Sequence, residues 1–328
     1  MIITKTPFRV SFCGGGSDLK SFYEKQEGCV ISATVNKYMY ISIHPYFDHE
    51  RISLKYSKTE LVDRADRIEH RILREALMEY GITGVEITST ADIPAGTGLG
   101  SSSAFTVGLV NALNEYTGTP AAKAALAEHA CDIEINRLGS PIGKQDQYAA
   151  AFGGLNFIRF LPSGETLVEP VKIKRETLAL LDKRLLMFYT GRLHDANRIL
   201  SEQSANMTKA DKTEGLKQMC GLAWELKQVL EQNNLDSFGA LLHENWLIKK
   251  TLASGITAPE IDAAYETALR HGAKGGKLLG AGGGGFLLFY CEEERQAELK
   301  NALRLREFPF HLERDGSIVI FRDSVSEF

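Results

Sequence analysis

The sequence lacks the patterns that mark several large classes of protein. Its five cysteines are an odd number, widely scattered and without a Cys-x-x-Cys pair, which argues against a disulfide framework or a zinc site and favours a reducing cytoplasm. No apolar run approaches the length that spans a membrane, and the N-terminus has no apolar core of the kind a signal peptide needs. The eight histidines form no His-x-x-x-His pattern, so we assign none to a metal.

An excess of one charge is also missing. Lysine and arginine total 38 against 42 acidic residues, a formal net charge of −4. Without a basic field we expect neither a nucleic acid nor a membrane as a partner. The chain has 328 residues, 44% of them hydrophobic, which is ordinary for a globular protein and enough for two domains. A change in composition near residue 180 predicts domains at 1–180 and 181–328.

Glycine, by contrast, is abundant, and it gathers in the stretches 14–16, 96–100 and 272–285. The middle stretch follows a predicted strand, and three serines after it begin a predicted helix. Glycine lets backbone N–H groups approach a ligand, and a helix N-terminus adds further donors and a positive dipole. Together these features favour a phosphate site, although a glycine-rich turn with a serine cap would look the same. The stretch matches neither a P-loop nor a dinucleotide-binding fingerprint.

Hydrophobic periodicity predicts an α+β arrangement of helices and strands. The expected strands cover residues 2–12, 30–43, 85–90, 155–161, 185–189, 286–290 and 317–321. The expected helices cover 19–26, 60–80, 101–118, 121–137, 144–151, most of 194–253, and 259–271, with a charged helix before the last strand. Residues 272–285 are either a flexible connection or backbone packed closely against a ligand.

Three segments resemble, in order, the three motifs of the GHMP small-molecule kinases, which include galactokinase, homoserine kinase and mevalonate kinase. They are Thr6-Pro-Phe-Arg-Val-Ser-Phe-Cys-Gly-Gly-Gly-Ser-Asp18, Pro94–Ala104 and Lys277–Phe286. The resemblance implies a two-domain α+β fold, with an N-terminal ribosomal-protein-like α/β domain and a C-terminal ferredoxin-like domain. ATP would bind at the junction of the two domains.

Within that family, galactokinase and mevalonate kinase carry Gly-Glu-His where this chain has Gly14-Gly15-Gly16. The Gly-Gly-Gly-Ser-Asp form, with the segment Cys131–Tyr148, resembles the branch that phosphorylates heptose phosphates. The implied reaction transfers the γ-phosphate of ATP, with Mg²⁺, to the anomeric hydroxyl of D-glycero-D-manno-heptose 7-phosphate, giving the 1,7-bisphosphate. The alternatives are a kinase for another sugar, such as fucose, and a catalytically silent sensor of sugar and nucleotide. A homodimer is left open.

The resemblance also implies roles for single residues. Asp146 matches the catalytic aspartate and Arg9 the basic residue that neutralises the transferred phosphoryl group; on their own they would be a solvated helix carboxylate and an edge-strand arginine. Glu134 and Ser102 match the Mg²⁺ ligands, against a surface carboxylate and an N-cap. Asp18 matches a ligand of sugar hydroxyls and could also cap a helix.

The remaining expectations concern ATP and the acceptor. The ATP-binding residues implied are Pro94, Gly96, Gly98, Leu99, Gly100, Ser101, Ser102, Ser103, Gly282 and Gly283. The acceptor-binding residues implied are Gly15, Gly16, Ser17, Asp18 and Lys144. Lys144 would bind the acceptor's distal phosphate or lower the pKa of Asp146, and the sequence does not choose between them. Arg192, His194 and Arg198 could reach a sugar phosphate or simply form a solvated helix face.

Overall fold

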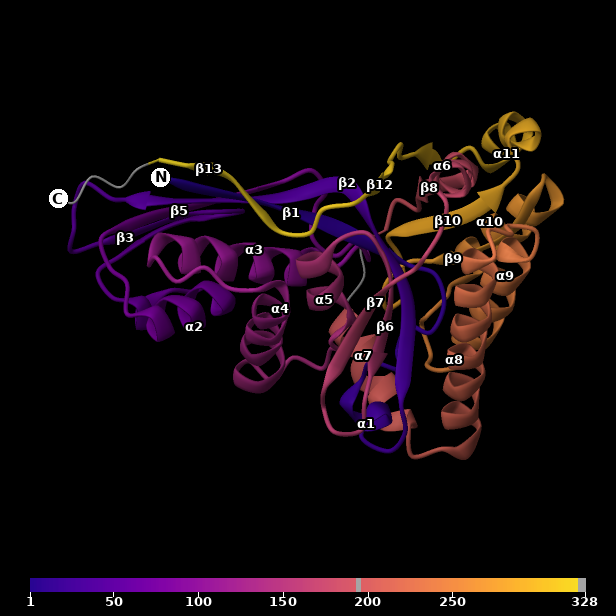
Figure 1. Ribbon diagram of the computed structural model, residues 1–328, viewed down its shortest axis with the longest axis horizontal. Helices are drawn as coiled ribbons and strands as arrows, with labels where there is room; N and C mark the ends of the chain where they lie inside the picture. The colour runs from indigo at the N-terminus through magenta and orange to yellow at the C-terminus, as the bar shows by residue number, and fades with distance from the viewer. Residues whose placement is uncertain (193–195, 324–328) are drawn as a thin grey trace.

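The computed structural model describes residues 1–192 and 196–323, which form two sheets with helices packed against them (Figure 1). The first sheet has the strand order β13-β1-β2-β5-β3-β4, and β2 also pairs with β12 and with β6, which pairs with β7. Apart from the parallel pair β3–β5, its strands run antiparallel. Its strands are β1 (Ile2–Ser11), β2 (Gly28–Pro45), β3 (Ile52–Lys55), β4 (Thr59–Val62), β5 (Val85–Ala91), β6 (Leu155–Phe160), β7 (Thr166–Pro170), β12 (Leu312–Glu313) and β13 (Ile318–Arg322).

Helices cover one face of this sheet, with α3 packed directly against β1 and β2 (Figure 1). The approach is close at Gly108, where a Cβ would lie 2.8 Å from Thr6 Oγ1, and Thr4 Oγ1 donates to the Gly108 carbonyl. Nearly every residue of α3 after its first turn is buried, so α3 is the central helix of this layer. The helices of the first half are α1 (Lys20–Tyr23), α2 (Arg71–Tyr80), α3 (Ser101–Tyr116), α4 (Lys123–Cys131) and α5 (Gln145–Phe152).

The second sheet has four antiparallel strands in the order β11-β8-β10-β9. Helix α9 packs on β9, while α8 also reaches β2 of the first sheet, so the two halves share apolar contacts. The strands are β8 (Leu185–Tyr189), β9 (Ala273–Leu278), β10 (Phe286–Cys291) and β11 (Arg306–Glu307). The helices are α6 (Arg175–Arg184), α7 (Ala196–Asn206), α8 (Ala210–Glu231), α9 (Phe238–Lys249), α10 (Pro259–Arg270) and α11 (Gln296–Leu303).

The end of the chain returns to the first sheet, where β13 runs beside β1 (Figure 1). A buried polar cluster fixes this return: Ser317 Oγ lies 2.8 Å from Thr6 Oγ1 and accepts from Asn111 Nδ2 at 3.0 Å. The boundary predicted near residue 180 falls in α6, ahead of the first strand of the second sheet. A single boundary does not describe β12 and β13, which come late in the sequence and belong to the first sheet.

Two local predictions were wrong. The helix expected over 60–80 begins only at Arg71, because residues 59–62 form the strand β4. The Glu60 carboxylate on that strand accepts hydrogen bonds from the backbone N–H groups of Glu69 and His70, just before the helix. Residues 273–278, expected as part of a glycine-rich loop, form the strand β9. Glycine is needed there because a Cβ at Gly276 would lie 2.4 Å from the ring of Phe289 on β10.

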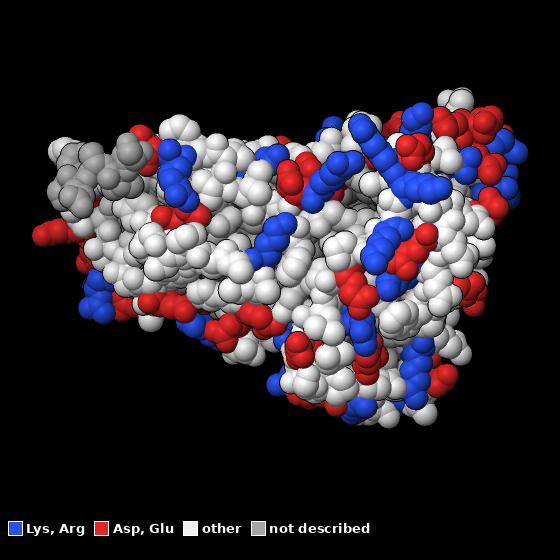
Figure 2. Space-filling model, viewed as in Figure 1, with Lys and Arg blue, Asp and Glu red and all other residues white. Residues whose placement is uncertain are grey.

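The surface agrees with the balanced charge of the sequence. Figure 2 shows acidic and basic side chains interspersed on one face of the molecule, with no continuous basic area. Among the described helices none is both long and apolar enough to cross a membrane.

The packing of α9 on β9 yields a stability prediction. A Cβ at Gly275 would lie 1.9 Å from the Gly239 carbonyl oxygen of α9, so we expect Gly275→Ala to lower the free energy of unfolding by about 1–3 kcal/mol through overpacking. Gly221→Ala is the matched control, since Gly221 lies in α8 with nothing near its Cβ position and should be neutral or slightly stabilising. Chemical denaturation measures both, and equal stability of the two variants would contradict the prediction.

Candidate functional site

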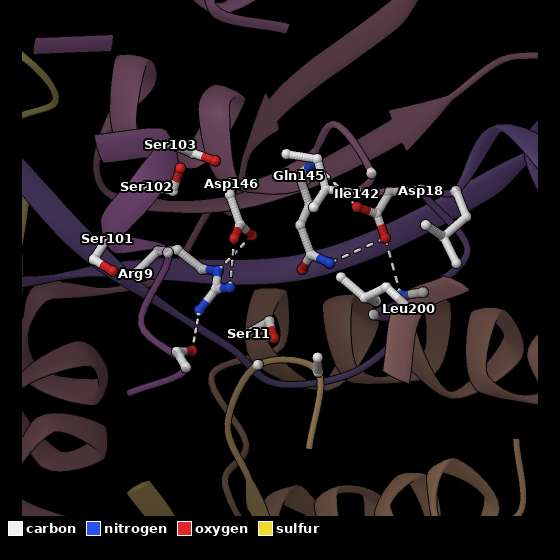
Figure 3. A pocket seen from close by; sticks show the side chains of 18 of the residues that line it. Arg9, Ser11, Asp18, Ser101, Ser102, Ser103, Ile142, Gln145, Asp146 and Leu200 are labelled. Carbon is white, nitrogen blue, oxygen red and sulfur yellow. Dashed lines mark hydrogen bonds and ion pairs between the residues drawn. The ribbon is translucent and has the colours of Figure 1, made fainter. Parts of the chain in front are cut away.

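A cleft of about 290 Å³ lies where the first sheet, the start of α3 and the glycine-rich loop after β9 meet. The close-up in Figure 3 shows Ser101, Arg9 and Asp146 toward one end, and Gln145, Asp18 and Leu200 toward the other. Three cationic residues (Arg9, Lys249, Lys277) and three acidic ones (Asp18, Glu134, Asp146) line the cleft, so its charges are balanced in number.

The loop before α3 is shaped by alternating glycines. Gly96, Gly98 and Gly100 all have positive φ, from 74° to 87°, a conformation that side chains disfavour. A Cβ at Gly98 would lie 2.5 Å from the Leu279 carbonyl oxygen, and a Cβ at Gly280 would lie 2.6 Å from the Gly98 Cα. The two glycine-rich loops therefore touch backbone to backbone, and Gly96, Gly98, Gly100 and Gly280 all line the cleft.

Arg9 and Asp146 form a partly buried bidentate ion pair in the cleft (Figure 3). Arg9 Nε donates to Asp146 Oδ1 and Nη2 donates to Oδ2, each at 2.7 Å, while Nη1 donates to the Gly98 carbonyl at 2.7 Å. Asp146 lies in the first turn of α5, and its side chain stays 23% exposed. A Cβ at Gly100 would lie 3.2 Å from Asp146 Oδ2. The carboxylate thus meets the end of the glycine loop.

Ser102 and Glu134, which are 32 residues apart, lie in contact. Ser102 Oγ donates to Glu134 Oε1 at 2.6 Å, and Gln147 Nε2 donates to Oε2 at 2.7 Å. Glu134 belongs to a π-helical turn, Asp132–Arg137, that follows α4 and turns its carboxylate inward. Burial raises the pKa of Glu134, although these hydrogen bonds oppose the shift and Asp146 adds to it.

The pair fits Mg²⁺, which takes hard oxygen ligands and combines one or two carboxylates with water and phosphate oxygens. Among the described residues no three His, Cys, Asp or Glu side chains gather into a metal cluster. Ser102 and Glu134 would supply two protein oxygens to such an ion.

Asp18 is the buried carboxylate at the other end of the cleft. Its Oδ1 accepts from the Gly16 backbone N–H at 2.9 Å and from Gln145 Nε2 at 3.0 Å, and its Oδ2 accepts from the Gln145 backbone N–H at 3.2 Å (Figure 3). Burial raises the pKa of Asp18, and the nearby Asp146 adds to the rise. A Cβ at Gly143 would lie 1.9 Å from Asp18 Oδ2, so the glycine makes room for the carboxylate.

Two buried lysines of the cleft were missed as site residues. Lys277 Nζ donates to the Phe12 carbonyl at 3.0 Å, and Lys249 Nζ lies 3.2 Å from Gln203 Oε1. Burial lowers the pKa of Lys277 to about 7 and that of Lys249 to about 8. Lys277 stands in the quoted motif, and Lys249 is the last residue of α9, where helical spacing places it on the same face as the buried Leu242 and Trp246. That spacing is the sequence signal that could have identified Lys249.

The other expected residues are placed as follows. Gly15, Gly16, Ser101 and Ser103 line the cleft. Ser17 Oγ is buried against β2, donating to the carbonyls of Gly14 and Cys29, and the Leu99 side chain is in the core. Gly282 and Gly283 pack against Ile256, while Pro94 is exposed and its carbonyl accepts from Thr97 Oγ1. Among these, the residues that do not line the cleft are Ser17, Pro94, Leu99, Gly282 and Gly283.

The expected basic residues lie elsewhere. Lys144 lines a separate pocket, where Nζ donates to the Gly164 carbonyl at 2.8 Å and lies 3.5 Å from Glu128. Arg192 is exposed and pairs with Glu260 at 3.0 Å. Arg198 lies exposed on α7, and His194 falls outside the described residues.

Comparisons with known proteins agree on one family. Residues 70–154 match the model of the GHMP kinase N-terminal domain and residues 223–308 that of the GHMP kinase C-terminal domain, together more than half of the chain. The chain is 28% identical, over 92% of its length and 93% of the relative's, to a D-glycero-alpha-D-manno-heptose 7-phosphate kinase of Campylobacter jejuni. It is 25% identical over 90% of its length to a bifunctional fucokinase/GDP-fucose pyrophosphorylase of Arabidopsis thaliana, of which it spans 30%.

A solved structure is similar over the whole chain. It is a D-glycero-D-manno-heptose 1-phosphate kinase from Bacteroides thetaiotaomicron, with a TM-score of 0.80 and 27% identity. The match covers 99% of this chain and 100% of that one, so the similarity extends over both sheets.

The buried lysines yield a prediction about pH. The folded protein lowers the pKa of Lys277 to about 7 from the usual 10.5. Above pH 10.5 the lysine is neutral in both states and its burial carries no penalty from charge. As the pH falls from 10.5 toward 7, the unfolded chain binds the proton more readily than the folded protein, so the folded protein loses stability. We expect Lys277→Met to be more stable than the wild type at pH 7.5 in the absence of ligand. The gain should shrink toward pH 10 with a slope of at most about 1.4 kcal/mol per pH unit.

Denaturation curves between pH 7 and 10 measure this difference. Lys250→Met is the control, because Lys250 is only partly buried and pairs with Asp262 outside the cleft. A stability gain for Lys277→Met that stays constant over the pH range would contradict the prediction.

Proposed function

This chain belongs to the GHMP kinases, and from that premise we propose that it transfers the γ-phosphate of ATP to the anomeric hydroxyl of a heptose 7-phosphate. The predicted two-domain α+β kinase fold is confirmed by the family models and by the matching structure. The product would be the 1,7-bisphosphate, and the free buried cysteines are consistent with a reducing cytoplasm as the place of reaction.

The observation that carries the proposal is the position of the Arg9–Asp146 pair. It joins the glycine loop and the N-terminus of α3, which suit phosphate, to the part of the cleft that holds Asp18. A phosphoryl donor and a hydroxyl acceptor bound at these two ends would meet at Asp146. Phosphoryl transfer depends mainly on such positioning and on compensation of charge.

The chemistry follows from the side chains. Asp146 accepts the proton of the attacking hydroxyl, the new oxygen–phosphorus bond forms, and the bond to the β-phosphate oxygen breaks to release ADP. Both oxygens of Asp146 already accept from Arg9, which fixes the plane of the carboxylate, and each keeps a lone pair for the substrate. Mg²⁺ held by Ser102 and Glu134 would neutralise charge on the phosphate oxygens of the nucleotide. Arg9 compensates charge on the transferred group.

The choice of a heptose phosphate over another sugar rests on the relatives and on the Gly-Gly-Gly-Ser-Asp segment. The heptose 7-phosphate kinase of Campylobacter jejuni is 28% identical over 92% of this chain, and the bifunctional fucokinase is 25% identical over 90% of it. Fucose remains the second candidate acceptor. The homodimer stays a prediction.

A substrate panel tests the proposed function. We expect the wild-type enzyme with ATP and Mg²⁺ to release ADP with D-glycero-D-manno-heptose 7-phosphate, and to turn over fucose, galactose, mannose, mevalonate and homoserine poorly. A coupled ADP assay measures each rate. Turnover of fucose alone would identify fucose, and not a heptose phosphate, as the acceptor. No ADP release with any compound, while ATP still binds, would favour a catalytically silent sensor of sugar and nucleotide.

Asp146→Asn tests the assigned base. The amide keeps the size of the side chain but accepts no proton, so we expect kcat to fall by about 10²–10⁴-fold. The dissociation constant for ATP, measured by calorimetry, should change little. Asp66→Asn is the matched control, since Asp66 is exposed and pairs with Arg64 on the surface. An unchanged kcat in Asp146→Asn would refute the role.

A further inference from the structure

The backbone of Gly16 leaves space that two side chains from the second half of the chain occupy. Gly16 has φ +103°, and a Cβ there would lie 2.2 Å from Gln203 Nε2 and 3.4 Å from Lys249 Nζ. Lys249 ends α9, and Gln203 lies on α7. Any side chain at position 16 would therefore displace this pair.

Lys249 is a buried ammonium without a matching anion. Within the described residues it forms no ion pair, and its two contacts are neutral oxygens at 3.2 Å, Gln203 Oε1, and 3.5 Å, the Gly15 carbonyl. Only 5% of Lys249 is exposed. A buried charge in such a setting is costly unless an anion compensates it, and burial accordingly lowers the pKa of Lys249 to about 8.

A second observation points to the same place. Gln203 is fully buried, and its Nε2 has no hydrogen-bond partner. The side-chain carbonyl oxygen of Gln203 accepts a hydrogen bond from Lys249, so the NH₂ group of the amide is the part without a partner. Buried donors are almost always paired in folded proteins, and an unpaired one beside an uncompensated ammonium indicates that an acceptor is missing.

The position of Lys249 and Gln203 within the cleft bears on which anion they would bind. Lys249 lines the same cleft as Asp146. The charged groups that act on it include Asp18, which stabilises the ammonium, and Arg9 and Lys277, which oppose it. Leu200, one turn before Gln203 on α7, lies with Asp18 away from Ser101 in Figure 3. The site is thus at the acceptor end, apart from Ser102 and Glu134, where the nucleotide phosphates would bind.

We propose that Lys249, positioned by Gln203, binds the phosphate group that the acceptor already carries, and that this contact selects a sugar phosphate over a neutral sugar. The inference rests on the proposed kinase function and names the residue that recognises its substrate class. Lys144, the candidate from sequence, lines a different pocket and donates to a backbone carbonyl. Lys277 also adds positive charge, but it is held by the Phe12 carbonyl at 3.0 Å.

The test separates recognition of the phosphate from catalysis. We expect Lys249→Met to raise KM for heptose 7-phosphate by about 10- to 100-fold, because a charge-assisted contact is lost. The dissociation constant of the unphosphorylated heptose, measured as a competitive inhibitor, and KM for ATP should not change. Lys250→Met is the matched control: it removes the neighbouring lysine, which pairs with Asp262, and should leave all these constants unchanged.

A second variant guards against a folding defect. Gln203→Glu places a carboxylate next to Lys249, so an internal ion pair would replace the contact with the phosphate, and the same selective rise in KM is expected. With wild-type turnover of heptose 7-phosphate present, an unchanged KM in both folded variants overturns this site alone. An equal loss for phosphorylated and neutral sugars also overturns it, since that marks a structural role. Absence of wild-type turnover overturns the proposed function and this site with it.

Discussion

One arginine side chain joins the three elements on which the cleft depends. Arg9 extends from β1, binds both carboxylate oxygens of Asp146 on α5, and donates its remaining edge to Gly98 in the loop before α3. Because the guanidinium is planar and its donors have fixed directions, these contacts set the positions of the loop and the carboxylate relative to each other. A lysine, with its single charged point, would not impose this geometry.

The glycines of the loops follow from the same constraint. For Gly98 to accept from Arg9 while the loop after β9 closes over it, the two backbones must touch, and neither Gly98 nor Gly280 has room for a Cβ. The left-handed conformation of Gly100 then directs α3 so that Ser102 reaches Glu134 in the π-helical turn. The dense glycine of the sequence is therefore a requirement of close backbone packing between two distant segments.

The sequence predicted the parts of the site that carry motifs and missed those that do not. Arg9 with Asp146, and Ser102 with Glu134, were expected from motif positions, and the structure brings each pair into contact. Lys249 was missed because a lysine at the end of a helix is normally exposed, although its spacing from Leu242 and Trp246 places it on the buried face of α9. The strand β9 was missed for a related reason: its glycines serve packing against α9 and β10, which local propensity does not encode.

The segment Gly14-Gly15-Gly16 connects the fold to the choice of acceptor. Galactokinase and mevalonate kinase carry Gly-Glu-His at this place, and here a side chain at position 16 would collide with Gln203 and press on Lys249. The glycine at position 16 and the burial of Lys249 from α9 therefore depend on each other in this chain. The Lys249 ammonium and the Gln203 Nε2 group are donors at the end of the cleft that also holds the Asp18 carboxylate, and Gln203 Nε2 has no hydrogen-bond partner. A phosphate on the acceptor would accept hydrogen bonds from the Lys249 ammonium and the Gln203 amide, whereas a neutral sugar would bind without that contact, so the contact would select the phosphorylated acceptor.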